Sequence, residues 1–73
     1  MSEVIRSADD LAAAVRARRH ELGLTQEELA GVIGTHRMFV SQFESGKRSV
    51  RFELVLRLVQ ALGMDIELRS RDR

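Results

Sequence analysis

The chain is short, with 73 residues, no cysteine, two histidines and a formal net charge of +1 at pH 7. The missing cysteines exclude a disulfide scaffold and a thiolate metal site, and two histidines are too few for a metal cage. A domain of this size has a small core. We therefore expect it to depend on tight helix packing, on a partner subunit, or on both.

The sequence also argues against membrane and catalytic roles. No stretch has the apolar length of a membrane-spanning helix, and the first residues lack the apolar segment of a signal peptide. We expect a cytoplasmic protein with no membrane partner. There is no Ser, His and Asp set with recognisable spacing, no phosphate-binding loop and no His-rich motif. We therefore expect no catalytic residues, no cofactor and no metal.

The basic residues are unevenly distributed. They form three groups, which are Arg16, Arg18, Arg19 and His20, then Lys47, Arg48 and Arg51, and finally Arg69, Arg71 and Arg73. The acidic residues Asp9, Asp10, Glu27 and Glu28 fall elsewhere. Clustered bases on a weakly charged domain are typical of a surface that meets a phosphate backbone. A solvated charged face is the other interpretation of this pattern.

The first periodic segment runs from Ser7 to Leu22 and predicts a helix that ends before Gly23. Ser7 can cap this helix, and Asp10 completes a pair that is similar to a capping box. The side expected to face the core carries Leu11, Ala14, Val15, Arg18 and Leu22. Upstream, Val4-Ile5 could form a short strand.

Two shorter helices are predicted next. The first covers Thr25 to Val32, where Thr25 and Glu28 have capping-box spacing, and Gly34 breaks it. The second covers about His36 to Ser45 and ends before Gly46. Its apolar residues that should face inward are Val40 and Phe43.

A fourth helix is predicted from about Arg51 to Leu62, and Gly63 ends it. Its expected buried stripe consists of Phe52, Val55, Leu56, Val59 and Leu62. The periodicity then changes, because apolar Met64, Ile66 and Leu68 alternate with charged residues. This alternation predicts a half-buried strand at 64–69. The expected organisation is one mainly α domain over residues 1–73, with a helical core at 7–63.

The strand at 64–69 needs a pairing partner, because a lone strand leaves its backbone N–H and C=O groups unpaired. A mainly helical domain offers no sheet to receive it. The same strand of a second copy would pair with it and bury the apolar side. We therefore expect Met64, Ile66 and Leu68 to support a homodimer. A frayed C-terminal tail is the other interpretation.

The second and third predicted helices, with glycine between them, match a helix-turn-helix. The motif letters are LTQEELA at 24–30, IG at 33–34 and VSQFESGKR at 40–48. This series resembles the family of lambdoid phage repressors, Cro proteins and their bacterial relatives, called the XRE family, over about residues 11–63. The resemblance implies a four- to five-helix lambda-repressor-like domain that inserts its third helix into the major groove of DNA.

By this resemblance, the residues that contact bases are His36, Arg37, Met38 and Gln42. Arg37 is the strongest candidate, because a guanidinium can bond to both O6 and N7 of guanine. Gln42 could pair with adenine or reach a phosphate, and Met38 could pack on a thymine methyl group or make no contact. His36 stands at the N-cap, where it is a poor cap, and it could reach a phosphate.

The expected phosphate contacts come from the start of the second helix and from the third helix and its end. They are Thr25, Gln26, Ser41, Ser45, Lys47 and Arg48, which fix the register of the protein on DNA. Phe39 departs from the family pattern, which has a small residue there, and it could pack over the DNA backbone or against a partner subunit. The resemblance also implies that Glu44 is structural, and that it could pair with Arg18.

Within this family, the chain resembles HipB-type antitoxins in its length and in the alternating residues at its C-terminal end. That resemblance implies a homodimer that represses its own operon at a two-fold symmetric DNA operator and binds a HipA-type kinase toxin. A stand-alone phage-type repressor is the alternative within the class. A protein-interaction module that has lost DNA binding is the alternative outside it, although Arg37, Lys47 and Arg48 argue against that.

Overall fold

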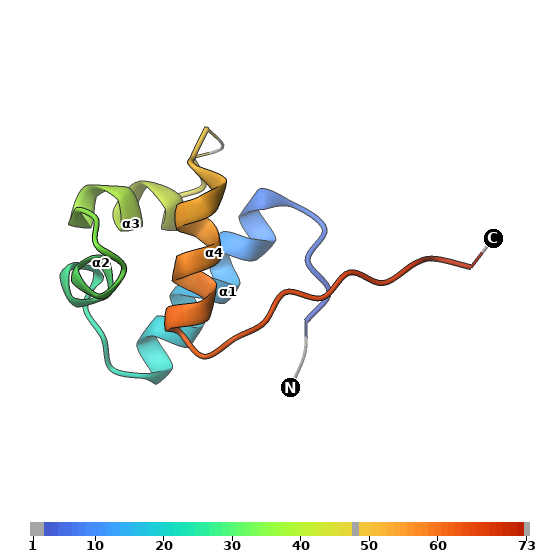
Figure 1. Cartoon of the computed structure of the whole chain (residues 1–73), viewed down its shortest axis with the longest axis horizontal. Coiled ribbons are helices and arrows are strands. Elements are labelled where there is room, and N and C mark those ends of the chain that lie inside the picture. The colour runs from blue at the N-terminus through green and yellow to red at the C-terminus, as the bar shows by residue number, and fades with distance from the viewer. Residues whose placement is uncertain (1–2, 48, 73) are drawn as a thin grey trace.

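The computed structural model describes residues 3–47 and 49–72, and within them the chain forms four helices. They are α1 (Ala8–Glu21), α2 (Gln26–Ile33), α3 (Arg37–Glu44) and α4 (Phe52–Ala61). α2 packs against α3 and α4, and α1 packs against α3. In Figure 1, α4 crosses in front of α1, and α2 and α3 lie to one side while the C-terminal segment extends to the other. The predicted mainly α architecture is confirmed.

Side-chain caps explain where α1 and α2 begin. Ser7 Oγ accepts the N–H of Asp10 at 3.0 Å, and the Asp10 carboxylate accepts the N–H of Arg6 at 2.9 Å. The return bond of the capping-box-like pair thus ends one residue earlier than in a standard capping box. At α2 the box is complete, because Thr25 Oγ1 accepts the Glu28 N–H at 3.0 Å and Glu28 Oε1 accepts the Thr25 N–H at 2.8 Å.

Two glycines determine how the chain enters and leaves α3. Gly34 has φ +78° and ends α2, with its N–H directed to the carbonyl groups of Ala30 and Gly31. Gly46 has φ +96°, and a Cβ atom there would lie 2.8 Å from Oδ1 of Asp9. A side chain at either position would strain the backbone, and at Gly46 it would also force the Asp9 side chain to move.

The core forms where the four helices meet. Its buried residues are Val15, Leu29, Ala30, Ile33, Val40, Phe43, Val55, Leu58, Val59 and Leu62. Val40 is completely buried and Phe43 is 5% exposed, so the predicted inward side of α3 is confirmed. These two side chains fix α3 against the rest of the molecule and leave its other side toward solvent.

The predicted stripe of α4 was wrong at Phe52, the first residue of the helix, which is 69% exposed although Val55 and Val59 on the same side are buried. The helix instead buries Leu54, Val55, Leu58 and Val59, and Leu62 follows as a buried C-cap. Periodicity places Phe52 on the apolar side of α4, but it does not show which residues at the start of a helix the neighbouring helices cover.

The predicted strands at Val4-Ile5 and 64–69 are absent from the described part of this single chain. Met64 is half-buried against the core and donates its N–H to the Val59 carbonyl at 3.0 Å, but Ile66 is 47% and Leu68 96% exposed. A strand needs a neighbour to complete its backbone hydrogen bonds. The described residues of the single chain form no other strand that could pair with 64–69, so the structure does not support the predicted strand.

Candidate nucleic-acid interface

The capping box positions the first turn of α2 as a possible anion-binding site. It engages the backbone N–H groups of Thr25 and Glu28. The N–H groups of Gln26 and Glu27, the first two residues of the helix, carry no carbonyl partner of the α-helical pattern. Together with the helix dipole, such groups attract a phosphate.

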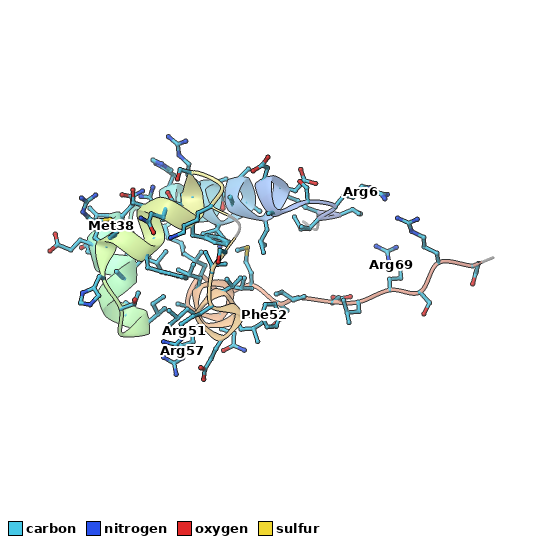
Figure 2. The ribbon with its side chains drawn as sticks, turned by 90° about the horizontal axis from the view of Figure 1, so that it is seen from above. Arg6, Met38, Arg51, Phe52, Arg57 and Arg69 are labelled. Carbon is cyan, nitrogen blue, oxygen red and sulfur yellow. The ribbon has the colours of Figure 1, made fainter. Side chains whose placement is uncertain are left out.

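α3 separates an inward apolar side from an outward polar side. Arg37 and Met38 are exposed at its start. Met38 is 61% exposed and lies on the outer side of the molecule (Figure 2). Ser41 and Gln42 are half-buried along the same helix. His36 is the N-cap and makes no side-chain cap bond, as its sequence position predicts.

Phe39 lies between these two sides. It is half-buried against the core, and its ring stacks on that of Phe43 with the centroids 6.3 Å apart and the planes 14° apart. The structure therefore gives Phe39 a packing role within the chain. Its contact with DNA or a partner subunit stays a prediction.

A buried ion pair joins α1 to α3. Nε of Arg19 lies 2.7 Å from Oε2 of Glu44, and Nη2 of Arg19 donates to Oε1 of Glu44 at 2.9 Å. The side chains are only 8% and 4% exposed. Nη1 of Arg19 also donates to the Leu24 carbonyl at 2.8 Å, so the guanidinium holds the start of the turn before α2.

The predicted partner of Glu44 was wrong, because Arg19 occupies the place given to Arg18. Nε of Arg18 donates to the Leu62 carbonyl at 3.0 Å, and Nη1 pairs with Glu21 at 3.2 Å. Adjacent residues on a helix point about 100° apart, in proportion to 3.6 residues per turn. Arg18 therefore reaches the end of α4, whereas Arg19 reaches α3.

Gln26 connects this ion pair to the outward side of α3. Its Nε2 donates to Oε1 of Glu44 at 3.1 Å, and its Oε1 accepts from Nη1 of Arg37 at 3.4 Å. The amide group therefore has one end on a buried carboxylate and the other on the best candidate for reading a base. In the free protein, Gln26 holds Arg37 near the start of α2.

The electrostatics of the pair follow from its surroundings. Burial raises the pKa of Glu44, but the hydrogen bonds from Arg19 and Gln26 and the charges of Arg19 and Arg16 outweigh it, so the pKa lies below its ordinary value. The hydrogen bond to Glu44 raises the pKa of Arg19, against the opposing effect of burial. Both side chains are therefore charged at neutral pH.

We expect this pair to make stability depend on pH in the acid range. Because the pKa of Glu44 is lowered on folding, its contribution is complete above the ordinary glutamate pKa of about 4.3 and is lost as the pH falls through the lower folded value. Urea unfolding of the wild type from neutral pH to about pH 2.5 should lose stability more steeply than that of Glu44→Gln. Parallel curves for the two proteins would contradict this assignment.

The predicted phosphate contacts lie around α3 and the start of α2. Lys47 Nζ lies 3.2 Å from Oε1 of Gln42, and Ser45 Oγ donates to the Gln42 carbonyl at 2.9 Å. The Gln42 amide oxygen has two lone pairs, so it can accept from a base as well as from Lys47. Arg48 lies outside the described residues.

A surface hollow of about 330 Å³ adjoins these residues and contains side chains that the sequence-based site did not include. Gln26, Ser41 and Ser45 line it together with Glu44 and with Arg16, Arg19 and His20 from α1. The basic group at 16–20 was visible in the sequence. The spacing of Arg16 and His20, four residues apart on one helix side, could have placed both in the site.

Other kinds of site find no support in the described residues. No three His, Cys, Asp or Glu side chains are grouped there in a way that could hold a metal ion. Within the same part of the chain, no helix has the length and apolar character needed to cross a membrane.

Comparison with known proteins agrees with the fold and the motif. An uncharacterized HTH-type transcriptional regulator of Sinorhizobium fredii, y4mF, is 38% identical over 68 residues, which cover 93% of this chain and 90% of that protein. A HipB–O4 20mer complex and a HipA–HipB–O2–O3 complex each contain a chain with a TM-score of 0.88 and 28% identity, covering 97% of this chain and 100% of theirs. The resemblance to helix-turn-helix regulators and to HipB is thereby confirmed. A family described as "Helix-turn-helix domain" matches residues 10–71, so the chain belongs to the helix-turn-helix family.

Proposed function

We propose that this chain is a sequence-specific DNA-binding transcriptional repressor that acts as a homodimer. The observation that carries the proposal is the two-sided α3, anchored by buried Val40 and Phe43 and presenting Arg37 and Met38 to solvent. An α-helix of this kind fits the major groove, where base edges are distinguishable. The relatives named as transcriptional regulators, and HipB in its DNA complex, support the same conclusion.

In the proposed complex, the base contacts come from Arg37, Met38, Gln42 and His36. Arg37 leaves Gln26 to bond a guanine, while Gln26 keeps its bond to Glu44. The phosphate contacts come from Thr25, Gln26, Ser41, Ser45, Lys47 and Arg48. Contacts of this second kind hold the protein in register and contribute little to base choice.

The proposed dimer is built on the C-terminal segment. Met64, Ile66 and Leu68 would be covered by the same segment of a second copy, whose strand would complete the backbone hydrogen bonds. Support comes from the exposure of Ile66 and Leu68, and of Phe52 on α4. A monomer that exposes these side chains leaves apolar surface in water, which favours association.

We extend the proposal to an antitoxin that regulates its own operon in the cytoplasm and binds a kinase toxin of the HipA type. Its support is the structural similarity, with a TM-score of 0.88, to a chain of a HipA–HipB–O2–O3 complex. A stand-alone phage-type repressor is the second candidate, since the site geometry serves both. Co-purification with the product of the neighbouring reading frame would select the antitoxin, and a neighbour unrelated to kinases would select the stand-alone regulator.

Selection of bound duplexes from a random pool tests the DNA-binding proposal without a known operator. The wild type should enrich a two-fold symmetric motif whose half-sites lie about one helical turn, ~34 Å, apart. Recovery of sequences with no shared motif would overturn the proposal.

Substitution of Arg37 should separate base reading from positioning. We expect Arg37→Ala to weaken operator binding by about 1–3 kcal/mol and to relax the preference at one position of each half-site. Lys47→Ala, the matched control, should weaken operator and unrelated DNA by similar factors. Competition binding to single-base variants of the selected motif measures both effects. An unchanged base preference in Arg37→Ala would show that another residue reads that base.

A further inference from the structure

We propose that Arg16 and His20 of α1 form a binding site for one DNA backbone phosphate, beside the recognition helix. The site is the hollow of about 330 Å³ that these residues share with Gln26, Ser41 and Ser45. The proposal rests on the proposed function, because it extends the DNA interface from α2 and α3 onto α1. It adds two residues that the helix-turn-helix motif itself does not contain.

The charge of the hollow favours a single anion. Arg19 and Glu44 also line it, but they pair with each other at 2.7 Å and cancel. Arg16 is left as the uncompensated charge, since it makes no hydrogen bond or ion pair within the described residues. A phosphodiester carries one negative charge, and an arginine fork can donate two parallel hydrogen bonds to its oxygens.

Arg16 and His20 both interact with the buried pair. The positive charge of Arg16 lowers the pKa of Glu44, so the two groups are close enough to interact. His20, one turn further along α1, has Nε2 3.4 Å from Nη2 of Arg19. Both side chains are exposed, and they line the same hollow as the Arg19–Glu44 pair.

The hollow is continuous with the proposed DNA contacts. Ser41 and Ser45 belong to α3 and its C-cap, and Gln26 is the first residue of α2. A backbone that passes over these three residues reaches the α1 side of the same hollow.

The test compares Arg16→Ala with Arg57→Ala, both removing one exposed arginine. Arg57 lies on α4, away from the hollow, and its ion pair with Glu53 at 3.6 Å is exposed. For Arg16→Ala we expect the slope of log affinity against log salt to fall by about one, equally on operator and scrambled duplexes. Arg16→Lys should restore the slope, and Arg57→Ala should keep the wild-type slope. A wild-type slope in Arg16→Ala, or an equal fall in Arg57→Ala, would overturn the proposal.

Two further readouts distinguish a site for DNA phosphate from a site for free anions. In NMR titrations, the Arg16 Nε–H and His20 ring signals should shift with a short duplex and stay unchanged with inorganic phosphate at the same ionic strength. Saturable shifts with inorganic phosphate alone would make the hollow a free-anion site and overturn the assignment to DNA. If the wild type binds all duplexes equally and Arg16→Ala still lowers the slope, the phosphate site stands and the repressor proposal fails.

Discussion

Glu44→Ala should destabilise the fold by about 3–5 kcal/mol, the typical cost of removing one partner of a buried ion pair. The substitution leaves the Arg19 guanidinium buried without its carboxylate, and Gln26 loses its acceptor. A domain of this size has a total stability near the low end of about 5–15 kcal/mol, so the variant should retain only about 0–2 kcal/mol and unfold at a much lower temperature than the wild type. Thermal and urea unfolding followed by circular dichroism, at a fixed protein concentration, measures the change.

Glu53→Ala is the matched control, because it removes a carboxylate that pairs with Arg51 and Arg57 on the surface. Exposed pairs contribute about 0–1 kcal/mol, so this variant should unfold close to the wild type. Glu44→Gln keeps the shape of the side chain and should lie between the two. A Glu44→Ala protein as stable as Glu53→Ala would show that the buried pair contributes little.

Deletion of residues 64–73 should convert the proposed dimer to a monomer and weaken operator binding by about 10²–10⁴-fold. The loss is large because a dimer binds its second half-site within one complex, at a high effective concentration that a monomer lacks. Sedimentation equilibrium measures the mass, and titration of the operator measures the affinity.

The deletion also removes half-buried Met64, which contacts the core, so it could destabilise the fold. A second variant therefore changes only exposed residues and leaves Met64 in place. Ile66→Glu combined with Leu68→Glu places charges on side chains that are exposed in the single chain. It should give a folded monomer with weak operator binding. A full dimer with unchanged operator affinity, in either variant, would refute a dimer built on this segment.

The sequence predicts the local structure well, because local rules determine it. The Ser7 and Thr25 caps and the positive-φ glycines Gly34 and Gly46 each depend on a few neighbouring residues, and each lies where expected. The apolar side of α3 was also predictable, since Val40 and Phe43 stand among polar residues.

The predictions from sequence were wrong where contacts between distant parts of the chain determine how a side chain is placed. Phe52 shares the apolar side of α4 with buried Val55 and Val59, and it is exposed because the neighbouring helices do not cover the start of α4. Both Arg18 and Arg19 are long basic side chains on α1, and only the position of α3 selects Arg19 as the partner of Glu44. The expected strand at 64–69 depends on a second chain, so neither the sequence periodicity nor a single chain can establish it.

The central claim is sequence-specific recognition, and one binding experiment tests it directly. The wild type is titrated with the DNA upstream of its own gene and with a shuffled duplex of the same composition, at several salt concentrations. We expect affinity for both duplexes to fall as salt rises, with the upstream DNA bound at least about 10³-fold more tightly at physiological salt. Equal affinity for the two duplexes at every salt concentration would contradict the account.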